Sequence, residues 1–122
     1  MVYHQKKYQQ QEADKRSLCL HGCIARKVLA EPALLSQATS TLQQRYEQKL
    51  LSYGAYLNWQ AILAQVSTPD NFIKAMTATD KTSIALRRKT IFTGVLNEKE
   101  RSDCLAARGY PIKTTTSRLL TT

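Results

Sequence analysis

The sequence contains few of the residues and segments that mark membrane, secreted or nucleotide-binding proteins. Among its 122 residues are only four glycines and three prolines. No apolar run approaches the ~18 residues that cross a bilayer, and the first residues lack the apolar stretch of a secretory signal. We therefore expect a folded chain without membrane contact, located in the cytoplasm, and neither disordered throughout nor fibrous.

Cysteine is also scarce, and its odd number argues against a secreted disulfide framework. The chain has three, Cys19, Cys23 and Cys104, so we expect free, partly buried thiols in a reducing compartment. The segment CLHGC contains two thiols and an imidazole, as a metal site would. On a helix, however, Cys19 and Cys23 share one face while His21 points elsewhere, and no second ligand pair completes four. We predict no metal and no cofactor.

Motifs for catalysis are missing as well. The chain has two histidines, no GxSxG, no glycine-rich phosphate loop and no cluster of paired acids. His21 is the only histidine inside the predicted domain, and nothing in the sequence marks a carboxylate that would orient it for nucleophilic catalysis. We therefore predict a protein that is not an enzyme.

Positive charge is what the chain has in excess. Eighteen Lys and Arg against nine Asp and Glu leave a net charge of +9. Such an excess favours polyanionic partners, whether DNA, RNA or an acidic protein surface. The basic residues are spread over both ends of the chain and one helix end, unlike the dense stripe of a groove-reading helix. Charge alone thus leaves both classes of partner open.

The hydrophobic pattern predicts an all-α fold, a compact bundle of five to six short helices between flexible N- and C-terminal tails. Residues 1–16 are polar and rich in Gln and Lys, and residues 109–122 are rich in Thr, so neither segment contributes to a core by itself. Residues 17–108 hold the apolar periodicity and form the predicted domain.

Helix boundaries follow from the residues that start and stop helices. From Leu18 onward, apolar residues recur at intervals of three and four, which predicts a helix. This first helix should end before Pro32, which begins a second helix. We expect Gly54 to close the second helix and Trp59 to lie at the centre of the core, on a third.

Further caps predict the C-terminal helices. Thr68 followed by Pro69 begins a fourth helix, and Asp80 caps a fifth. Asn97 and Glu100 have the spacing of a capping box for a sixth helix, which Gly109 ends.

The corner, defined here as residues 87–101, connects the fifth helix to the sixth and holds the candidate site. Its basic triplet, Arg87, Arg88 and Lys89, lies in the last turn of the fifth helix, where positive charges complement the helix dipole. Gly94 is the expected turn residue of the connection. Phe92 is open to two interpretations, an exposed contact for a partner or a member of the core. The candidate partner-binding residues are Arg87, Arg88, Phe92, Val95, Leu96 and Arg101.

Nucleic-acid binding is the alternative interpretation. Basic side chains at helix ends contact phosphates but read no bases, so the binding would be independent of sequence. The connection from Thr90 to Leu96 is apolar and longer than the turn of a helix-turn-helix. The candidate phosphate contacts are Lys6, Lys7, Arg87, Arg88 and Lys89.

Several of these residues belong to a pattern spread along the chain: Leu20-His21 with Ile24-Ala25, Pro32 with Leu34-Leu35, Trp59, Leu86-Arg87, Phe92 to Leu96, and Glu100-Arg101. The chain thereby resembles a group of short, largely uncharacterised bacterial proteins of the form LH..IA, P.LL, W..LL and LR..SPF.GVL...ER. Some of that group are encoded beside presumed toxins and are interpreted as antitoxins. Here Thr90-Ile91-Phe92-Thr93 replaces the group's Ser-Pro-Phe. The resemblance implies an accessory protein of a bacterial defence, toxin–antitoxin or mobile-element system, which binds a partner protein such as a cognate toxin through the corner.

Overall fold

The computed structural model describes residues 2–110, with side chains from residue 6 onward. The helices are α1 (Val2–Ala30), α2 (Pro32–Glu47), α3 (Tyr53–Ala64), α4 (Pro69–Met76), α5 (Lys81–Arg88) and α6 (Glu98–Ala107), and a 3-10 turn, Gln65–Ser67, precedes α4. The predicted all-α class is therefore confirmed. Most of the predicted Thr-rich C-terminal tail, from residue 111, lies outside the described residues.

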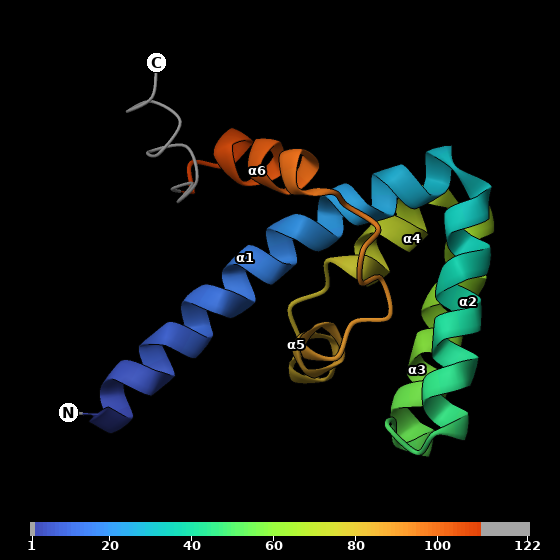
Figure 1. Ribbon diagram of the computed structural model, residues 1–122, viewed down its shortest axis with the longest axis horizontal. Coiled ribbons are helices and arrows are strands. Elements are labelled where there is room, and N and C mark those ends of the chain that lie inside the picture. The colour runs from blue at the N-terminus through green and yellow to red at the C-terminus, as the bar shows by residue number, and fades with distance from the viewer. Residues whose placement is uncertain (1, 111–122) are drawn as a thin grey trace.

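Helix α1 is the element on which the others assemble (Figure 1). It packs against α2, α4, α5 and α6. Helices α2 and α3 form an antiparallel pair beside its C-terminal end, while α6 lies beside its second half. Within residues 2–110, no helix is both long enough and apolar enough to cross a membrane.

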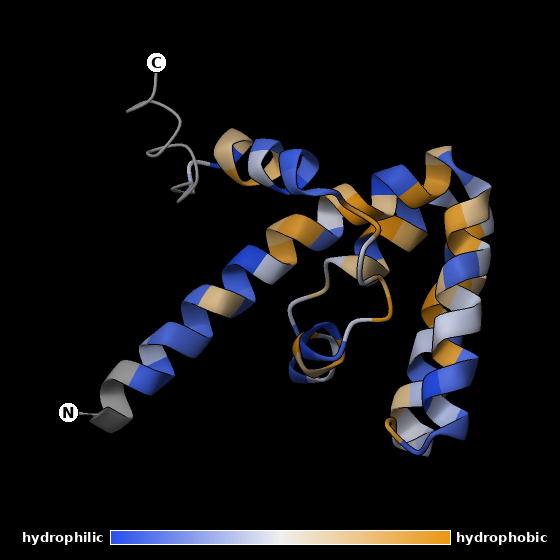
Figure 2. Ribbon diagram, in the orientation of Figure 1, coloured by the Kyte–Doolittle hydropathy of each residue, from blue (hydrophilic) through white to orange (hydrophobic). Residues whose placement is uncertain are grey.

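The first helix begins at Val2, far earlier than the predicted start near Leu18. Residues 2–16 contain no proline or glycine, and Gln, Lys, Glu and Ala are good helix formers. They also continue a helix whose second half is anchored by packing, so they pay no nucleation cost. Composition correctly predicted only the lack of core contact. The part of α1 that precedes Asp14 is mostly hydrophilic and stands away from the other helices (Figure 2).

The core lies where the second half of α1 meets α3, α4 and the corner. Trp59, Phe72 and Phe92 are among its largest fully buried side chains. The rings of Trp59 and Phe92 meet edge to face, with centroids 5.7 Å apart. The predicted place of Trp59 is confirmed, and the open question for Phe92 is decided in favour of the core, because only 2% of its surface is exposed.

The end of α2 differs from the prediction. The helix stops at Glu47, Lys49 takes a positive φ of 62°, and Gly54 lies inside the first turn of α3. Ser52 caps α3 by accepting a hydrogen bond from the Ala55 amide at 3.1 Å. A serine cap, with a break after Glu47, therefore separates the two helices where we expected a glycine.

The caps of the last helices were predicted correctly. Asp80 accepts a hydrogen bond from the Ser83 amide at 3.2 Å, and Asn97 and Glu100 form the reciprocal capping box of α6. Gly109 follows α6 with a φ of 81°. Thr68 occupies the N-cap position of α4, although its side chain makes no capping hydrogen bond.

The burial of Phe92 leads to a stability prediction. Truncation to alanine in Phe92→Ala should lower the free energy of unfolding by about 3–5 kcal/mol, through lost transfer energy and a cavity beside Trp59. Urea unfolding followed by circular dichroism measures this change. Leu57→Ala is the matched control, since Leu57 is 43% exposed. The control should stay within about 0.5 kcal/mol of the wild type. Equal effects of the two changes would contradict the core position of Phe92.

Candidate binding site

Polar side chains from α1 and α2 hold the corner, whose residues 89–97 form no helix. His21 of α1 accepts a hydrogen bond from the Thr90 hydroxyl at 2.8 Å. The Arg45 guanidinium of α2 donates to the carbonyl of the same threonine. Lys27 of α1 donates to the Val95 carbonyl at 2.7 Å. Backbone groups that no helix satisfies thus find partners in distant side chains.

His21 joins α1 to the corner in its neutral form. Its Nδ1–H donates to the Ser17 carbonyl at 2.7 Å, which leaves Nε2 to accept from Thr90. Thr90 Oγ1 in turn accepts the Phe92 amide at 3.2 Å. Burial lowers the pKa of His21 to about 4, so the ring is uncharged near pH 7. The ring is held by structural contacts and has no carboxylate partner among them.

Arg87 and Arg88 lie in the last turn of α5, as predicted, and in addition contact other elements. Arg87 is buried and donates to the Met76 carbonyl, at the end of α4, at 3.2 Å. Arg88 makes two hydrogen bonds to Asp14 of α1, at 3.1 and 2.7 Å. These bonds hold the pKa of the Asp14 carboxyl below its usual range. Both arginines therefore tie α5 to its neighbours.

The apolar residues of the corner do not form the exposed contact surface that we expected. Phe92 and Val95 are buried, and Leu96 is half-buried against the same core. Phe92 and Val95 also close a turn: the Val95 amide donates to the Phe92 carbonyl at 3.1 Å, and Gly94 has a φ of 83°. A positive φ at that position is what a type II turn requires, so the predicted role of Gly94 is confirmed.

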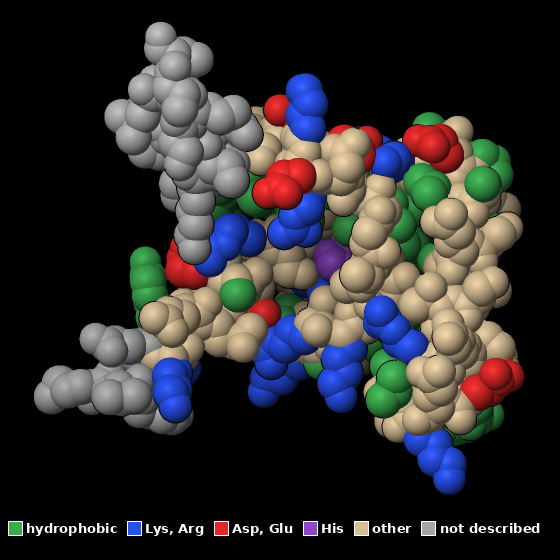
Figure 3. Space-filling model, viewed as in Figure 1, with side chains coloured by type: hydrophobic (Ala, Val, Ile, Leu, Met, Phe, Trp, Pro, Cys, Tyr) green, Lys and Arg blue, Asp and Glu red, His purple; other side chains and the backbone are tan. Residues whose placement is uncertain are grey.

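A hollow of about 400 Å³ lies between α1, α5, the corner and α6. We name it the basic hollow. Figure 3 shows Lys and Arg side chains around the middle of this face. Four of the six predicted partner-binding residues line the hollow, and Arg88 and Val95 do not. The side chains and backbone that line it include Arg16, Ser17, His21, Arg87, Thr90, Phe92, Thr93, Leu96, Arg101 and Leu105.

The charged residues that line the basic hollow are all positive. Arg16 from α1, Arg87 from α5 and Arg101 from α6 line it, together with hydroxyl groups, and none of its lining residues is an Asp or Glu. Neither Arg16 nor Arg101 forms an ion pair with a residue of the described part of the chain. Guanidinium groups bind carboxylates and phosphates through paired hydrogen bonds. The hollow therefore suits an anionic group.

The residues predicted to contact phosphates are not all brought together. Lys6 and Lys7 are exposed on the free-standing part of α1, and Lys89 is exposed at the end of α5. The contact between Asp14 and Arg88 places α5 beside the middle of α1. Lys6 therefore lies about 12 Å further along the helix axis, given the rise of an α-helix.

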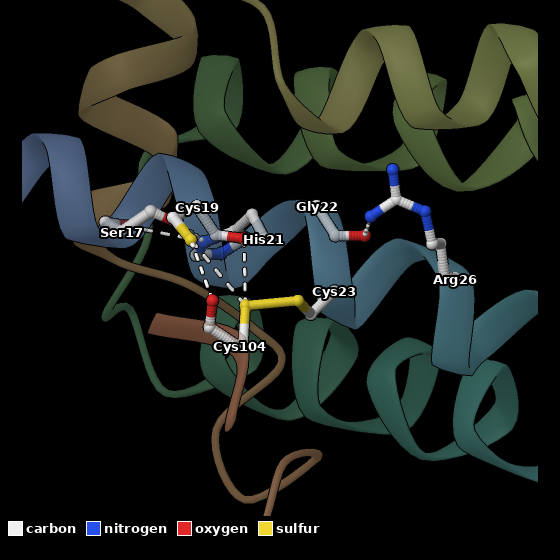
Figure 4. The surroundings of a disulfide bond; sticks show 7 residues. All are labelled: Ser17, Cys19, His21, Gly22, Cys23, Arg26 and Cys104. Atoms are coloured by element: carbon white, nitrogen blue, oxygen red, sulfur yellow. Dashed lines mark hydrogen bonds between the residues drawn. A yellow bond between two sulfur atoms is a disulfide. The ribbon is translucent and has the colours of Figure 1, made fainter. Parts of the chain in front are cut away.

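The cysteines correct two predictions. Cys23 and Cys104 form a disulfide between α1 and α6, with Cα atoms 6.5 Å apart, so neither is the free thiol that we predicted (Figure 4). Cys19 is the one free thiol in the described part of the chain, and its Sγ lies 3.7 Å from Cys104 Sγ. The pairing escaped prediction because it joins residues 81 positions apart, which only the packing of α6 on α1 brings together.

The CLHGC segment does not gather around an ion. His21 contacts Thr90, as described above, while Cys23 is bonded covalently to Cys104 of α6, outside the segment. Among residues 6–110, whose side chains the structure describes, nowhere do three or more His, Cys, Asp or Glu side chains lie where they could hold a metal ion.

Comparison with known proteins gives no match: no protein-family model, no curated protein and no solved structure is similar to this chain. The similarity to antitoxin-like bacterial proteins remains a prediction from the sequence. The geometry and charge of the basic hollow are therefore the features of the structure that bear on function.

The buried, neutral His21 leads to a pH prediction. Its pKa is about 4 in the folded chain against 6.5 for an ordinary histidine, so the unfolded chain binds the proton more tightly. Stability from the neutral ring is thus fully present above pH 6.5 and is lost as the pH falls toward 4.

We expect the free energy of unfolding to fall by about 2 kcal/mol between pH 7 and pH 5, measured by urea unfolding. This pH dependence should disappear in His21→Leu and persist in His4→Gln, which removes the other histidine of the sequence. A His21→Leu variant with the wild-type pH dependence would show that His21 is not the titrating group.

Proposed function

We propose that this chain is a small, non-enzymatic interaction module that binds an acidic segment of a partner protein in the basic hollow. The observation that supports it is that Arg16 and Arg101 line the same hollow from different helices, without a carboxylate among the lining residues. The sequence resemblance adds the biological setting: an antitoxin-like or regulatory component of a bacterial defence, toxin–antitoxin or mobile-element system, acting in the cytoplasm.

Most basic side chains at the corner are already bonded within the fold, which favours an acidic peptide over a nucleic-acid strand as the ligand. A strand presents a phosphate at every nucleotide and needs a track of available cations. Here Lys27 pairs with Glu100 at 2.7 Å, Arg45 donates to the corner's backbone, and Arg88 pairs with Asp14. These cations hold the fold itself. What remains is a concave site that can take one or two carboxylates.

The part of α1 that precedes Asp14 supports the second candidate, binding of nucleic acid. It is a helix with exposed side chains from Lys6 to Gln11, and it stands away from the bundle. A helix without an apolar face gains little from its own domain, and Lys and Gln contact phosphates and base edges. Sequence-independent binding by Lys6, Lys7 and Lys89 is therefore the alternative function.

The proposed function predicts the effect of removing charge from the basic hollow. A tagged chain purified from its native host with nuclease treatment should retain a stoichiometric protein, and Arg16→Gln/Arg101→Gln should lose it. Lys74→Gln, at an exposed lysine of α4 outside the hollow, is the control and should retain it. If the captured protein alone arrests growth, co-expression of the wild-type chain should restore growth and the double variant should not.

Two results would contradict this proposal. Retention of the captured protein by the double variant would remove the hollow as its site. Recovery of nucleic acid alone, lost at high salt or after nuclease treatment, would favour the alternative.

Nucleic-acid binding, the alternative function, leads to a separate prediction. If Lys6 and Lys7 contact phosphates, the logarithm of the binding constant for double-stranded DNA should fall steeply with the logarithm of salt concentration. Lys6→Gln/Lys7→Gln should reduce that slope by about 2, close to one for each contact removed. Fluorescence anisotropy at several salt concentrations measures the slope. An unchanged slope in the double variant would exclude this part of α1 as a phosphate contact.

A further inference from the structure

A third sulfur touches the disulfide between α1 and α6. Cys19 and Cys23 lie one turn apart on α1, and both reach Cys104 of α6 (Figure 4). The Cys19 Sγ also lies 3.7 Å from the Cys104 carbonyl oxygen, within reach of an S–H donor. Cys104 is therefore placed to bond with either of two thiols on the neighbouring helix. The proposed binding function does not use this arrangement.

Cys19 and Cys23 are both half-buried, so solvent reaches the cluster at both of these sulfurs, but of the two only Cys19 opens into the hollow described next. The side chain of Cys104 is buried, whereas Cys19 is half-buried and lines a hollow of about 440 Å³ on the other side of α1 from the basic hollow. We name this second hollow the thiol pocket. Neither Cys23 nor Cys104 lines it. Its lining includes Lys15, Cys19, Arg26, Thr77, Arg108 and Tyr110.

The thiol pocket is basic as well. Lys15, Arg26 and Arg108 line it, and none of its lining residues is an Asp or Glu. Burial raises the pKa of the Cys19 thiol, and the positive charge of Arg108 acts in the opposite direction. Cations beside a thiol stabilise its thiolate, which is the nucleophile in disulfide exchange. The same cations attract carboxylates on an incoming molecule.

We propose that Cys19 is the entry thiol for formation and reduction of the Cys23–Cys104 disulfide, and that the thiol pocket binds a carboxylate-bearing, low-molecular-weight disulfide or thiol. In the cytoplasm, where we propose above that this chain acts, a disulfide is usually transient and redox-active, so a path by which it forms and breaks is expected. The contact among three sulfurs and the basic, accessible pocket provide that path in one place.

The exchange starts from the reduced chain. The Cys19 thiolate attacks one sulfur of the small disulfide, whose S–S bond breaks, and the first small thiolate leaves. Cys104 then attacks Cys19 Sγ. This attack forms a Cys19–Cys104 bond and releases the second small thiolate. Finally Cys23 attacks Cys104 Sγ, the Cys19–Cys104 bond breaks, and Cys19 leaves as a thiolate.

Electrons and protons balance over these steps. Cys23 and Cys104 lose two electrons, the small disulfide gains them, and the two protons of these cysteines end on the two small thiols. Cys19 is recovered unchanged, which explains why the structure contains a free thiol against a formed disulfide. The same steps in reverse reduce the disulfide when the small thiol is in excess.

The test follows the reoxidation of the reduced, full-length chain. Glutathione disulfide is the anionic probe and bis(2-hydroxyethyl) disulfide the neutral one, with alkylation and peptide mass mapping at each time point. With glutathione disulfide, Cys19→Ser should form the Cys23–Cys104 bond at least about ten-fold more slowly, because the remaining thiols lie outside the pocket. In Cys23→Ser, the adduct or the Cys19–Cys104 bond should accumulate.

Charge variants test the pocket separately. Arg26→Gln/Arg108→Gln should slow the reaction with glutathione disulfide by roughly five-fold and leave the neutral probe unaffected, as expected for the loss of two exposed ion pairs. Lys74→Gln should change neither rate.

Three results would overturn the proposal: a Cys19→Ser variant that reoxidises at the wild-type rate, a first adduct that maps to Cys23 or Cys104, or equal effects of the charge variants on both probes. Should Cys19→Ser fold poorly, adduct mapping in the wild-type chain decides the question alone. None of these readouts depends on a protein partner, so they fail or succeed independently of the proposed function.

Discussion

The hydrogen bond between His21 and Thr90 is the contact on which the corner depends. The connection from α5 to α6 has no helix of its own, so its polar backbone groups need partners from elsewhere. His21 fixes the Thr90 hydroxyl, that hydroxyl accepts the Phe92 amide, and the Phe92 ring then packs on Trp59. Because the imidazole is buried, it must remain neutral to accept this bond. One neutral side chain thus connects the longest helix, the corner and the core.

Two groups of basic side chains can be distinguished in the folded chain. Lys27, Arg45, Arg87 and Arg88 turn toward carbonyl or carboxylate groups and hold α2, α4, α5 and the corner in place. Arg16 and Arg101 are left lining a hollow between the helices that hold them. The disulfide between Cys23 and Cys104 joins those two helices. A covalent bond therefore constrains the relative position of the two arginines.

What could be predicted from the sequence were features set by neighbouring residues. Asp80 accepts a hydrogen bond from an amide three residues away, and Asn97 and Glu100 bond to each other over the same spacing. Gly94 provides the positive φ of its own turn. The helical conformation of residues 2–16 escapes prediction from composition, because a lack of apolar residues does not exclude a helix that continues from a packed one.

The candidate site was predicted only in part, because its contacts join distant residues. The segment that contains Arg87 and Arg101 was found from charge and turn signals, but Arg16 was not, since α1 meets α6 only in the folded chain. Lys27, Arg45 and Cys104 find their partners at separations of 45 to 81 residues. The burial of Phe92 follows from these contacts, which no local pattern shows.

A double-mutant cycle on His21 and Thr90 tests the central claim most directly. The changes are His21→Leu, Thr90→Val and their combination, and the free energy of unfolding is measured at pH 7 by urea denaturation. The account predicts that the two changes are not additive, with a coupling energy of about 1 kcal/mol or more, as for a buried hydrogen bond. Additive effects would mean that the contact does not hold the corner, and the arrangement of the basic hollow would then need another cause.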